Sequence, residues 1–226
     1  MVSYELEDGI ATITIDDGKV NVLSPDTQRA IHDALDRAEQ DQAVVLLTGR
    51  PGVFSAGFDL SILRLGREAA AGMVQGGFRL AARLLAHPAP VVVASSGHAI
   101  AMGAFLMACG DYRIGTAGPY KVVANELAIG LSFPHTPAAI LRSRLTPAAV
   151  HRAILMAEEF DPARAVEAGW LDRVVAAEEL PTVALEAART FKRFDRSAFV
   201  TSKTRLIQST VDAVRIALEL DAVAPI

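Results

Sequence analysis

Cysteine is almost absent from this sequence, which has Cys109 alone among 226 residues. A single cysteine excludes an intramolecular disulfide and any metal cluster built from several thiolates. The five histidines show no spacing typical of metal ligands, and the zinc motif HExxH does not occur. We therefore expect no metal, and a reducing, cytoplasmic location.

A concentration of positive charge is also lacking. The formal net charge is -4, and the Lys and Arg residues are dispersed along the chain. A basic footprint for a polyanion is therefore missing, and we expect no nucleic-acid partner. The sequence also has no GxxxxGK[ST] phosphate loop and no GxSxG nucleophile elbow.

Long uninterrupted hydrophobic runs are missing too. The N-terminal MVSYELEDGI has no basic segment followed by an apolar one, so no secretory signal is expected. The stretch between Arg83 and Asp111 contains no charged residue, but Pro88, Pro90 and Gly97 divide it. It is therefore expected to form a buried strand and helix, and not a membrane span.

The elements that are present follow an α/β order. Alternating apolar and polar residues around Asp8-Gly9 predict an antiparallel hairpin. Ser24-Pro25 is an N-cap followed by a first-turn proline and predicts a helix over residues 25–40. The apolar runs 43–48, 90–95 and 111–115 predict buried strands, separated by helical segments. This alternation predicts an α/β protein with crossover connections.

The pattern changes after Glu126. Thr146-Pro147 and Asp161-Pro162 are typical helix starts, and Gly169 is a typical helix end. We therefore predict an α/β core over residues 1–131 and a helical C-terminal part over residues 132–226, forming one continuous domain.

The stretch Val91 to Asp111 reads as a strand, a Ser-Gly turn and a helix that begins among small residues at 101–103. The N–H groups at that helix start would point into a pocket. The loop Val53–Leu60 and the segment Asn125–Leu131 are expected to meet it and complete one site.

Three segments together resemble a known family. FSAGFDL at residues 54–60, SGHAIAMGAFLMACGDYRIG at 96–115 and NELAIGL at 125–131 are similar, in order and separation, to the enoyl-CoA hydratase/isomerase or crotonase superfamily. This resemblance implies a spiral core of ββα units with a helical C-terminal part. It also implies an acyl-CoA substrate, no cofactor beyond the coenzyme A of that substrate, and a homotrimer or dimer of trimers, with the C-terminal helices serving oligomerisation and forming a lid.

The same resemblance implies a backbone oxyanion hole for the thioester oxygen. By position its donors are the N–H groups of Ala56 and Met102, although family members usually have glycine where this chain has Met102. A core role for the Met102 side chain is the alternative. The stretch through Gly57, Phe58 and Asp59 would lie along the thioester and pantetheine arm, and Asp59 is expected to hold the loop by binding backbone N–H groups.

Glu126 is the strongest side-chain candidate. It interrupts the apolar segment VVANELAI, where a carboxylate needs a specific reason to occur. Burial would raise its pKa toward the range useful for proton transfer. The resemblance makes it the general acid/base; a salt-bridged structural glutamate is the alternative.

Phe105 stands where hydratases of the family have a second glutamate. A phenyl ring cannot handle water, whereas moving a proton between two carbons needs one carboxylate. The resemblance therefore favours an isomerase that converts a 3-enoyl-CoA to a 2-enoyl-CoA. A hydratase using Glu126 and His135, or a non-catalytic CoA-binding protein, is the alternative. His135 is expected either to line the acyl end or to cap the following helix.

Basic residues are expected to bind the CoA phosphates, with surface solvation as the alternative. The candidates are Lys19, Arg50, Arg64 and Lys203. His98 is expected to pack beside its strand and not to act with Ser96 as a nucleophile and base.

Overall fold

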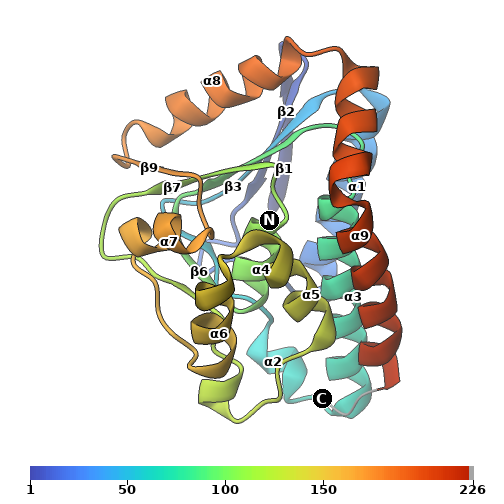
Figure 1. The fold of residues 1–226 in the computed structure, drawn as a ribbon, viewed down its shortest axis with the longest axis vertical. Coiled ribbons are helices and arrows are strands. Elements are labelled where there is room, and N and C mark those ends of the chain that lie inside the picture. The colour runs from blue at the N-terminus through green and yellow to red at the C-terminus, as the bar shows by residue number, and fades with distance from the viewer. Residues whose placement is uncertain (224–226) are drawn as a thin grey trace.

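A computed structural model describes residues 1–223, and within them the strands form two sheets (Figure 1). The larger sheet has the order β1-β2-β3-β5-β7-β9, and the smaller has the order β4-β6-β8. The strands of the larger sheet are β1 (Val2–Glu7), β2 (Ile10–Ile15), β3 (Val44–Gly49), β5 (Val91–Ser95), β7 (Tyr112–Thr116) and β9 (Arg173–Val175). Those of the smaller sheet are β4 (Gly52–Ser55), β6 (Gly97–Ile100) and β8 (Val122–Val123).

Helices follow and surround these strands. They are α1 (Pro25–Gln40), α2 (Leu60–Leu63), α3 (Arg67–Leu85), α4 (Met102–Ala108), the 3-10 turn η1 (Leu127–Ile129), α5 (His135–Arg144), α6 (Pro147–Leu155), α7 (Pro162–Ala168), α8 (Leu180–Lys192) and α9 (Arg196–Val223). None of the helices in residues 1–223 is both long and apolar enough to cross a membrane.

The chain alternates between the two sheets. β3 leads into β4, β5 into β6 and β7 into β8. Strands β3, β5 and β7 pair in parallel in the larger sheet, and β4, β6 and β8 pair in parallel in the smaller one. Each pair is followed by a helix or a turn of helix before the next pair begins. This repetition confirms the predicted spiral of ββα units. The prediction missed β4 and β6 as strands, because it assigned them to a loop and to a turn.

The N-terminal elements follow their local signals. The hairpin pairs Glu7 with Ile10, and Asp8 and Gly9 both have a positive φ, as a two-residue turn of this type requires. The Ser24 side chain accepts a hydrogen bond from the Thr27 N–H at the start of α1. Both predictions from the sequence, the hairpin and the helix over residues 25–40, are confirmed.

The C-terminal helices pack onto the first 131 residues. The main hydrophobic cluster joins strand residues such as Leu47 to Ile140 of α5 and Val214 of α9. A second cluster lies between the other face of the larger sheet and α8, where Ala184 packs near Leu46 (Figure 1). The caps at Thr146 and Asp161 and the helix end at Gly169 are confirmed. The division at residue 131 stays a prediction.

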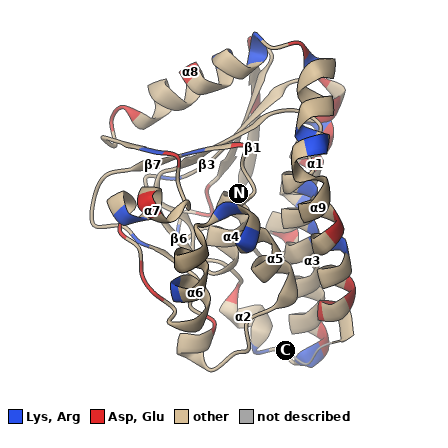
Figure 2. Ribbon diagram, viewed as in Figure 1, with Lys and Arg blue, Asp and Glu red and all other residues tan. Residues whose placement is uncertain are grey.

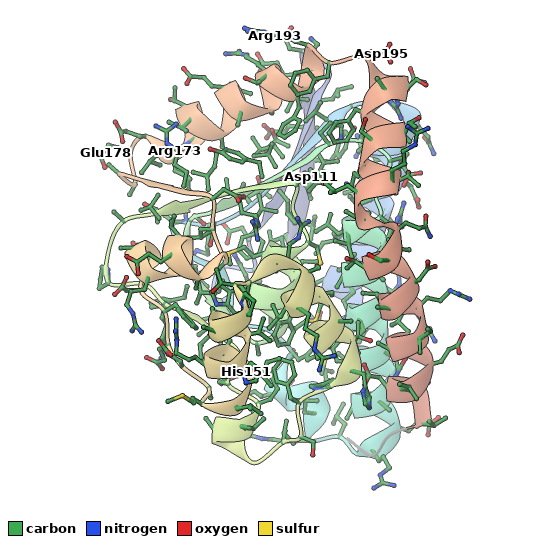
Figure 3. All side chains as sticks on the ribbon, in the orientation of Figure 1. Asp111, His151, Arg173, Glu178, Arg193 and Asp195 are labelled. Carbon is green, nitrogen blue, oxygen red and sulfur yellow. The ribbon has the colours of Figure 1, made fainter. Side chains whose placement is uncertain are left out.

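Helix α9 is fixed to the core by a buried ion pair. The Lys203 ammonium lies 2.7 Å from a carboxylate oxygen of Asp111, which Figure 3 labels among the interior side chains. Lys203 is 8% exposed, and burial lowers its pKa although Asp111 opposes that effect. A lysine buried in this way cannot bind a CoA phosphate, so the prediction for Lys203 is wrong.

Candidate active site

A cavity of about 420 Å³ lies between α3, α4, the segment 126–135 and the end of α9. Four of the residues predicted from the sequence line it: Phe58, Phe105, Glu126 and His135. Its remaining wall is largely apolar, with Asp221 of α9 as a second carboxylate. An apolar cavity with a few polar groups is typical of a small-molecule site.

Glu126 is the acid/base candidate of this cavity. It is 8% exposed, and burial raises its pKa to about 7 against the opposing effect of a hydrogen bond from its own N–H. Its Oε2 has no hydrogen-bond partner, and no cation pairs with Glu126, among the described residues. The salt-bridged alternative is therefore wrong, and the carboxyl group titrates where proton transfer is efficient.

Among the described residues that line the cavity, Glu126 is the one carboxylate without a hydrogen-bonded role. The buried Phe105 ring packs edge-to-face on Phe133, with the ring centroids 5.6 Å apart. The two oxygens of Asp221 accept hydrogen bonds from the N–H groups of His135 and Thr136, each at 2.8 Å. Asp221 therefore caps α5, while the His135 side chain faces the cavity.

Met102 is the first residue of α4, and its N–H has no acceptor among residues 1–223. Ala101 before it has φ 49° and ψ -123°, a conformation that residues with a Cβ rarely adopt. A Cβ added to Gly57 would lie 3.3 Å from the Met102 nitrogen, so the loop and the helix start touch. The Met102 side chain is fully buried, so the residue packs in the core and also presents its N–H.

The loop supplies a different amide from the one predicted. The N–H of Ala56 donates to the carbonyl of Val20 at 2.9 Å, so it is already used, and its prediction as an oxyanion donor is wrong. The N–H of Gly57 donates to the Ser55 hydroxyl. The N–H of Phe58 finds no acceptor among the described residues.

The direction of the Phe58 N–H follows from its peptide bond. The carbonyl of Gly57 accepts a hydrogen bond from the Leu23 N–H at 2.8 Å. In a planar trans peptide the C=O and the following N–H point in opposite directions. The Phe58 N–H therefore points away from Leu23. The positive φ of 86° at Gly57 allows this turn.

Contacts also define two other predicted residues. Asp59 is the N-cap of α2 and accepts hydrogen bonds from the N–H and the hydroxyl of Ser61, so it holds the loop as expected. His98 accepts a hydrogen bond from the Lys121 N–H and packs on Tyr120. This confirms its packing role beside the strand.

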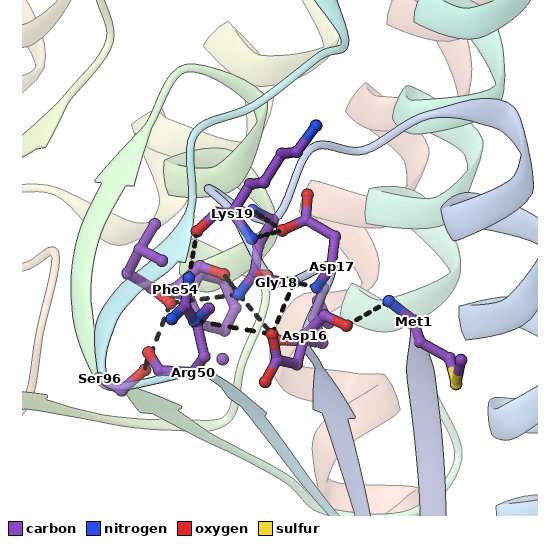
Figure 4. Close-up of polar contacts among 12 residues, drawn as sticks. Met1, Asp16, Asp17, Gly18, Lys19, Arg50, Phe54 and Ser96 are labelled. Atoms are coloured by element: carbon purple, nitrogen blue, oxygen red, sulfur yellow. Dashed lines mark hydrogen bonds and ion pairs between the residues drawn. The ribbon is translucent and has the colours of Figure 1, made fainter.

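Lys19 and Arg50 lie together beside the loop (Figure 4). Arg50 donates to the Lys19 carbonyl at 2.8 Å, while the Lys19 side chain extends away from these contacts. Arg64 is exposed at the end of α2. Basic and acidic residues are interspersed along the outer helices (Figure 2). Lys19, Arg50 and Arg64 stay candidates for binding phosphates.

Two buried amide side chains near the site were missed by sequence reasoning. The Asn21 side chain donates to the Ile15 carbonyl at 2.7 Å, and the Asn21 backbone carbonyl accepts a hydrogen bond from the Ser55 hydroxyl. Gln28 donates to the carbonyls of Leu23 and Met73. Their partners lie up to 45 residues away in sequence, and no local motif signals such contacts.

Within residues 1–223, the fold is a spiral of ββα units. Its site combines the carboxyl group of Glu126, which has an unpaired oxygen in a largely apolar cavity, with the unpaired backbone N–H groups of Phe58 and Met102. Residues 5–223 match the model of the family described as enoyl-CoA hydratase/isomerase, and the chain belongs to that family.

Similar sequences and similar solved structures agree with this assignment. The human mitochondrial enoyl-CoA delta isomerase 1 is 30% identical over 95% of this chain and 72% of its own length. A crystal structure of an enoyl-CoA hydratase/isomerase family protein from Pseudomonas syringae is 44% identical, with a TM-score of 0.97 over 100% of this chain and 98% of that one. An apo structure of an enoyl-CoA isomerase from Mycobacterium tuberculosis is 43% identical, with a TM-score of 0.94 over 98% of this chain and 97% of that one.

Proposed function

We propose that this protein is an enoyl-CoA isomerase that converts a 3-enoyl-CoA to the conjugated 2-enoyl-CoA. The observation that carries this proposal is Glu126, whose buried carboxyl group faces the cavity with a pKa of about 7 and an unpaired oxygen. Phe105 lines the same cavity. One proton-transfer group in an otherwise apolar cavity suits a reaction that moves one proton and excludes water.

The chemistry follows from these groups. The Glu126 carboxylate removes a proton from C2, and the C2–H electron pair moves toward the thioester, placing negative charge on its oxygen. The N–H groups of Phe58 and Met102 stabilise that oxygen. The enolate electrons then return and form the C2–C3 double bond, while the C3–C4 π electrons take the same proton from Glu126 and become the new C4–H bond. The reaction is redox-neutral and needs no cofactor beyond the CoA of the substrate.

Substrate binding is proposed along the same loop. Gly57, Phe58 and Asp59 would flank the thioester and pantetheine arm, and Phe105 and His135 would contact the acyl group. Support comes from the cavity, which Phe58, Phe105 and His135 line together. Lys19, which lies beside the loop at the Val20 contact, would bind the CoA phosphates.

A hydratase is the competing function. His135 faces the cavity that contains Glu126, and a Mycobacterium avium relative, 30% identical over 91% of this chain, is named a probable enoyl-CoA hydratase. Hydration would need His135 or Glu126 to hold a water molecule against the apolar face of Phe105. The apolar wall therefore favours isomerisation.

The test supplies a 3-enoyl-CoA and follows formation of the 2-enoyl-CoA by its absorbance. Glu126→Gln should reduce turnover by at least about a thousandfold, because it removes the proton carrier and keeps the shape of the side chain. Glu167→Gln, an exposed glutamate on α7, is the matched control. Retained turnover in Glu126→Gln would contradict the proposal. Water addition to a 2-enoyl-CoA would identify a hydratase, and CoA binding without turnover a non-catalytic protein.

We also propose a trimeric assembly, alone or as a dimer of trimers, in the cytoplasm. Support for the assembly comes from the family resemblance and from large apolar side chains on the surface, such as Leu155 and Met156 at 65% and 71% exposure. Support for the cytoplasm comes from the single cysteine, Cys109. The mass of the protein in solution tests the assembly. A monomeric mass at micromolar concentration would contradict it.

A further inference from the structure

Helix α3 contains three glycines, although glycine is unfavourable inside helices. A Cβ added to Gly72 would meet nothing within 4 Å. A Cβ at Gly76 would lie 2.4 Å from the side-chain oxygen of Gln28, and one at Gly77 would lie 2.5 Å from the Phe58 ring. Two of the three glycines therefore make room for specific side chains.

Both of those side chains act on the loop that carries the free Phe58 amide. Gln28 is 4% exposed, and its amide nitrogen donates to the carbonyls of Leu23 at 2.9 Å and Met73 at 3.0 Å. The Leu23 N–H in turn holds the Gly57 carbonyl at 2.8 Å. A continuous series of hydrogen bonds thus runs from the backbone of α3 to the peptide that ends in the Phe58 N–H.

The ring of Phe58 supplies a second connection to α3. It lies against Gly77 and packs on Phe78, with ring centroids 6.2 Å apart. The Cγ of Met102 lies 3.5 Å from the position of a Cβ at Gly77. A side chain at position 77 would therefore meet both Phe58 and Met102, the two residues whose backbone N–H groups lack acceptors among the described residues.

We propose that Gln28 and Gly77 are positioning residues that fix the Phe58 N–H toward the thioester oxygen, an inference that rests on the proposed isomerase function. An oxyanion donor acts only when it lies about 2.7–3.1 Å from the developing charge. Because the loop has no regular secondary structure at Phe58, its direction depends on these contacts with α1 and α3.

The glycine series on α3 tests this inference with a built-in control. Gly77→Ala should lower kcat about 10- to 100-fold, because the new Cβ displaces the Phe58 ring, and should raise KM by about tenfold through the lost contact with the thioester oxygen. Gly72→Ala should leave kcat and KM unchanged. Alanine favours the helix more than glycine at both positions. Both variants should therefore stay folded at the assay temperature, and a thermal unfolding curve checks this. An unchanged kcat in Gly77→Ala would overturn the proposal.

A double-substitution cycle assigns the effect to the ring. In a Phe58→Leu background the clash is removed, so adding Gly77→Ala should change kcat less than about twofold. Equal losses of kcat in both backgrounds would overturn the role of the ring. Gln28→Met keeps the length of the side chain but cannot donate a hydrogen bond, so it should lower kcat about tenfold. Gln75→Met on α3 is its matched control and should leave kcat unchanged.

A binding experiment separates this proposal from the isomerase activity. An alkyl-CoA thioether has the same chain as a saturated acyl-CoA but no carbonyl oxygen. Calorimetry should show that the wild-type protein binds the acyl-CoA about tenfold or more tightly, and that Gly77→Ala loses this preference while Gly72→Ala keeps it. If the wild-type protein prefers the acyl-CoA over the thioether but shows no turnover, the isomerase function is refuted and the positioning role stands. Equal binding of the two ligands by the wild-type protein would overturn the positioning role.

Discussion

At the scale of single residues, the site depends on a carboxyl group kept in an unfavourable place. Glu126 is surrounded by apolar side chains and has no cation to stabilise its charged form among the described residues. Burial therefore raises its pKa to about 7. The same condition makes Glu126 a competent base near neutral pH and a burden on stability.

The pH dependence of catalysis should report this group. As a base Glu126 must be ionised in the free enzyme, so kcat/KM should rise with pH and level off with an apparent pKa of about 7. Initial rates with a 3-enoyl-CoA between pH 5 and pH 9 measure it. A profile that is flat from pH 5 upward would assign the proton transfer to a group of ordinary acidity.

Glu126→Gln should also stabilise the fold above neutral pH. Because the folded-state pKa, about 7, lies above the unfolded value of 4.5, the unfolded chain releases its proton first as pH rises. The wild-type fold therefore loses stability between these two values, by about 3 kcal/mol. Glutamine does not titrate and avoids this loss. Urea denaturation at pH 4 and pH 8 should show the advantage of Glu126→Gln only at the higher pH.

Residue roles were predictable where a side chain was chemically out of place. A glutamate within VVANELAI indicated a buried acid, and the structure places it in the cavity. Ala56 was assigned wrongly because the availability of an amide depends on its acceptor, here the carbonyl of Val20, 36 residues away in the chain. Local sequence contains no information on such a partner.

At the scale of elements, the end of α9 closes the cavity by capping α5. Asp221 accepts hydrogen bonds from the first two N–H groups of α5 while it lines the cavity. Asp221→Ala leaves those amides unpaired and should lower the free energy of unfolding by about 1–2 kcal/mol. It should also raise KM. Thermal unfolding and steady-state kinetics measure both, and Asp212→Ala on the same helix, which is exposed, is the control.

The second attachment of α9 is the Lys203–Asp111 pair. Lys203→Met leaves a largely buried carboxylate without its cation and should cost about 3 kcal/mol of stability. The double substitution Lys203→Met with Asp111→Asn removes both charges, and the amide oxygen of the new side chain would still accept the Val91 N–H. It should therefore cost clearly less than the sum of the single substitutions. Additive losses in urea denaturation would show that the two side chains are not coupled.

Elements were predictable where start and stop signals are local. The caps at Ser24, Thr146 and Asp161 each lie beside the proline that starts the helix. The strands β4 and β6 have four residues each and pair only with distant segments. Such short segments have no periodicity of their own, so sequence patterns indicated a loop and a turn instead.

At the scale of the whole molecule, the spiral brings the three site segments together. The loop after β4, the helix start after β6 and the segment after β8 all follow strands of the same parallel sheet. Because the carboxyl ends of parallel strands share one edge, these segments meet there. Three motifs at wide separation in the sequence thus become one site.

Residues on both sides of position 131 share one hydrophobic core. The main hydrophobic cluster includes Ile140, Trp170 and Val214, all from the C-terminal part, and Asp111 depends on Lys203 for its charge pair. A chain of residues 1–131 would expose the faces that these residues cover and should not fold cooperatively. Far-ultraviolet circular dichroism during urea denaturation measures this. The full chain should show one sharp transition and the fragment none; a sharp transition of the fragment would establish the α/β core as an independent domain.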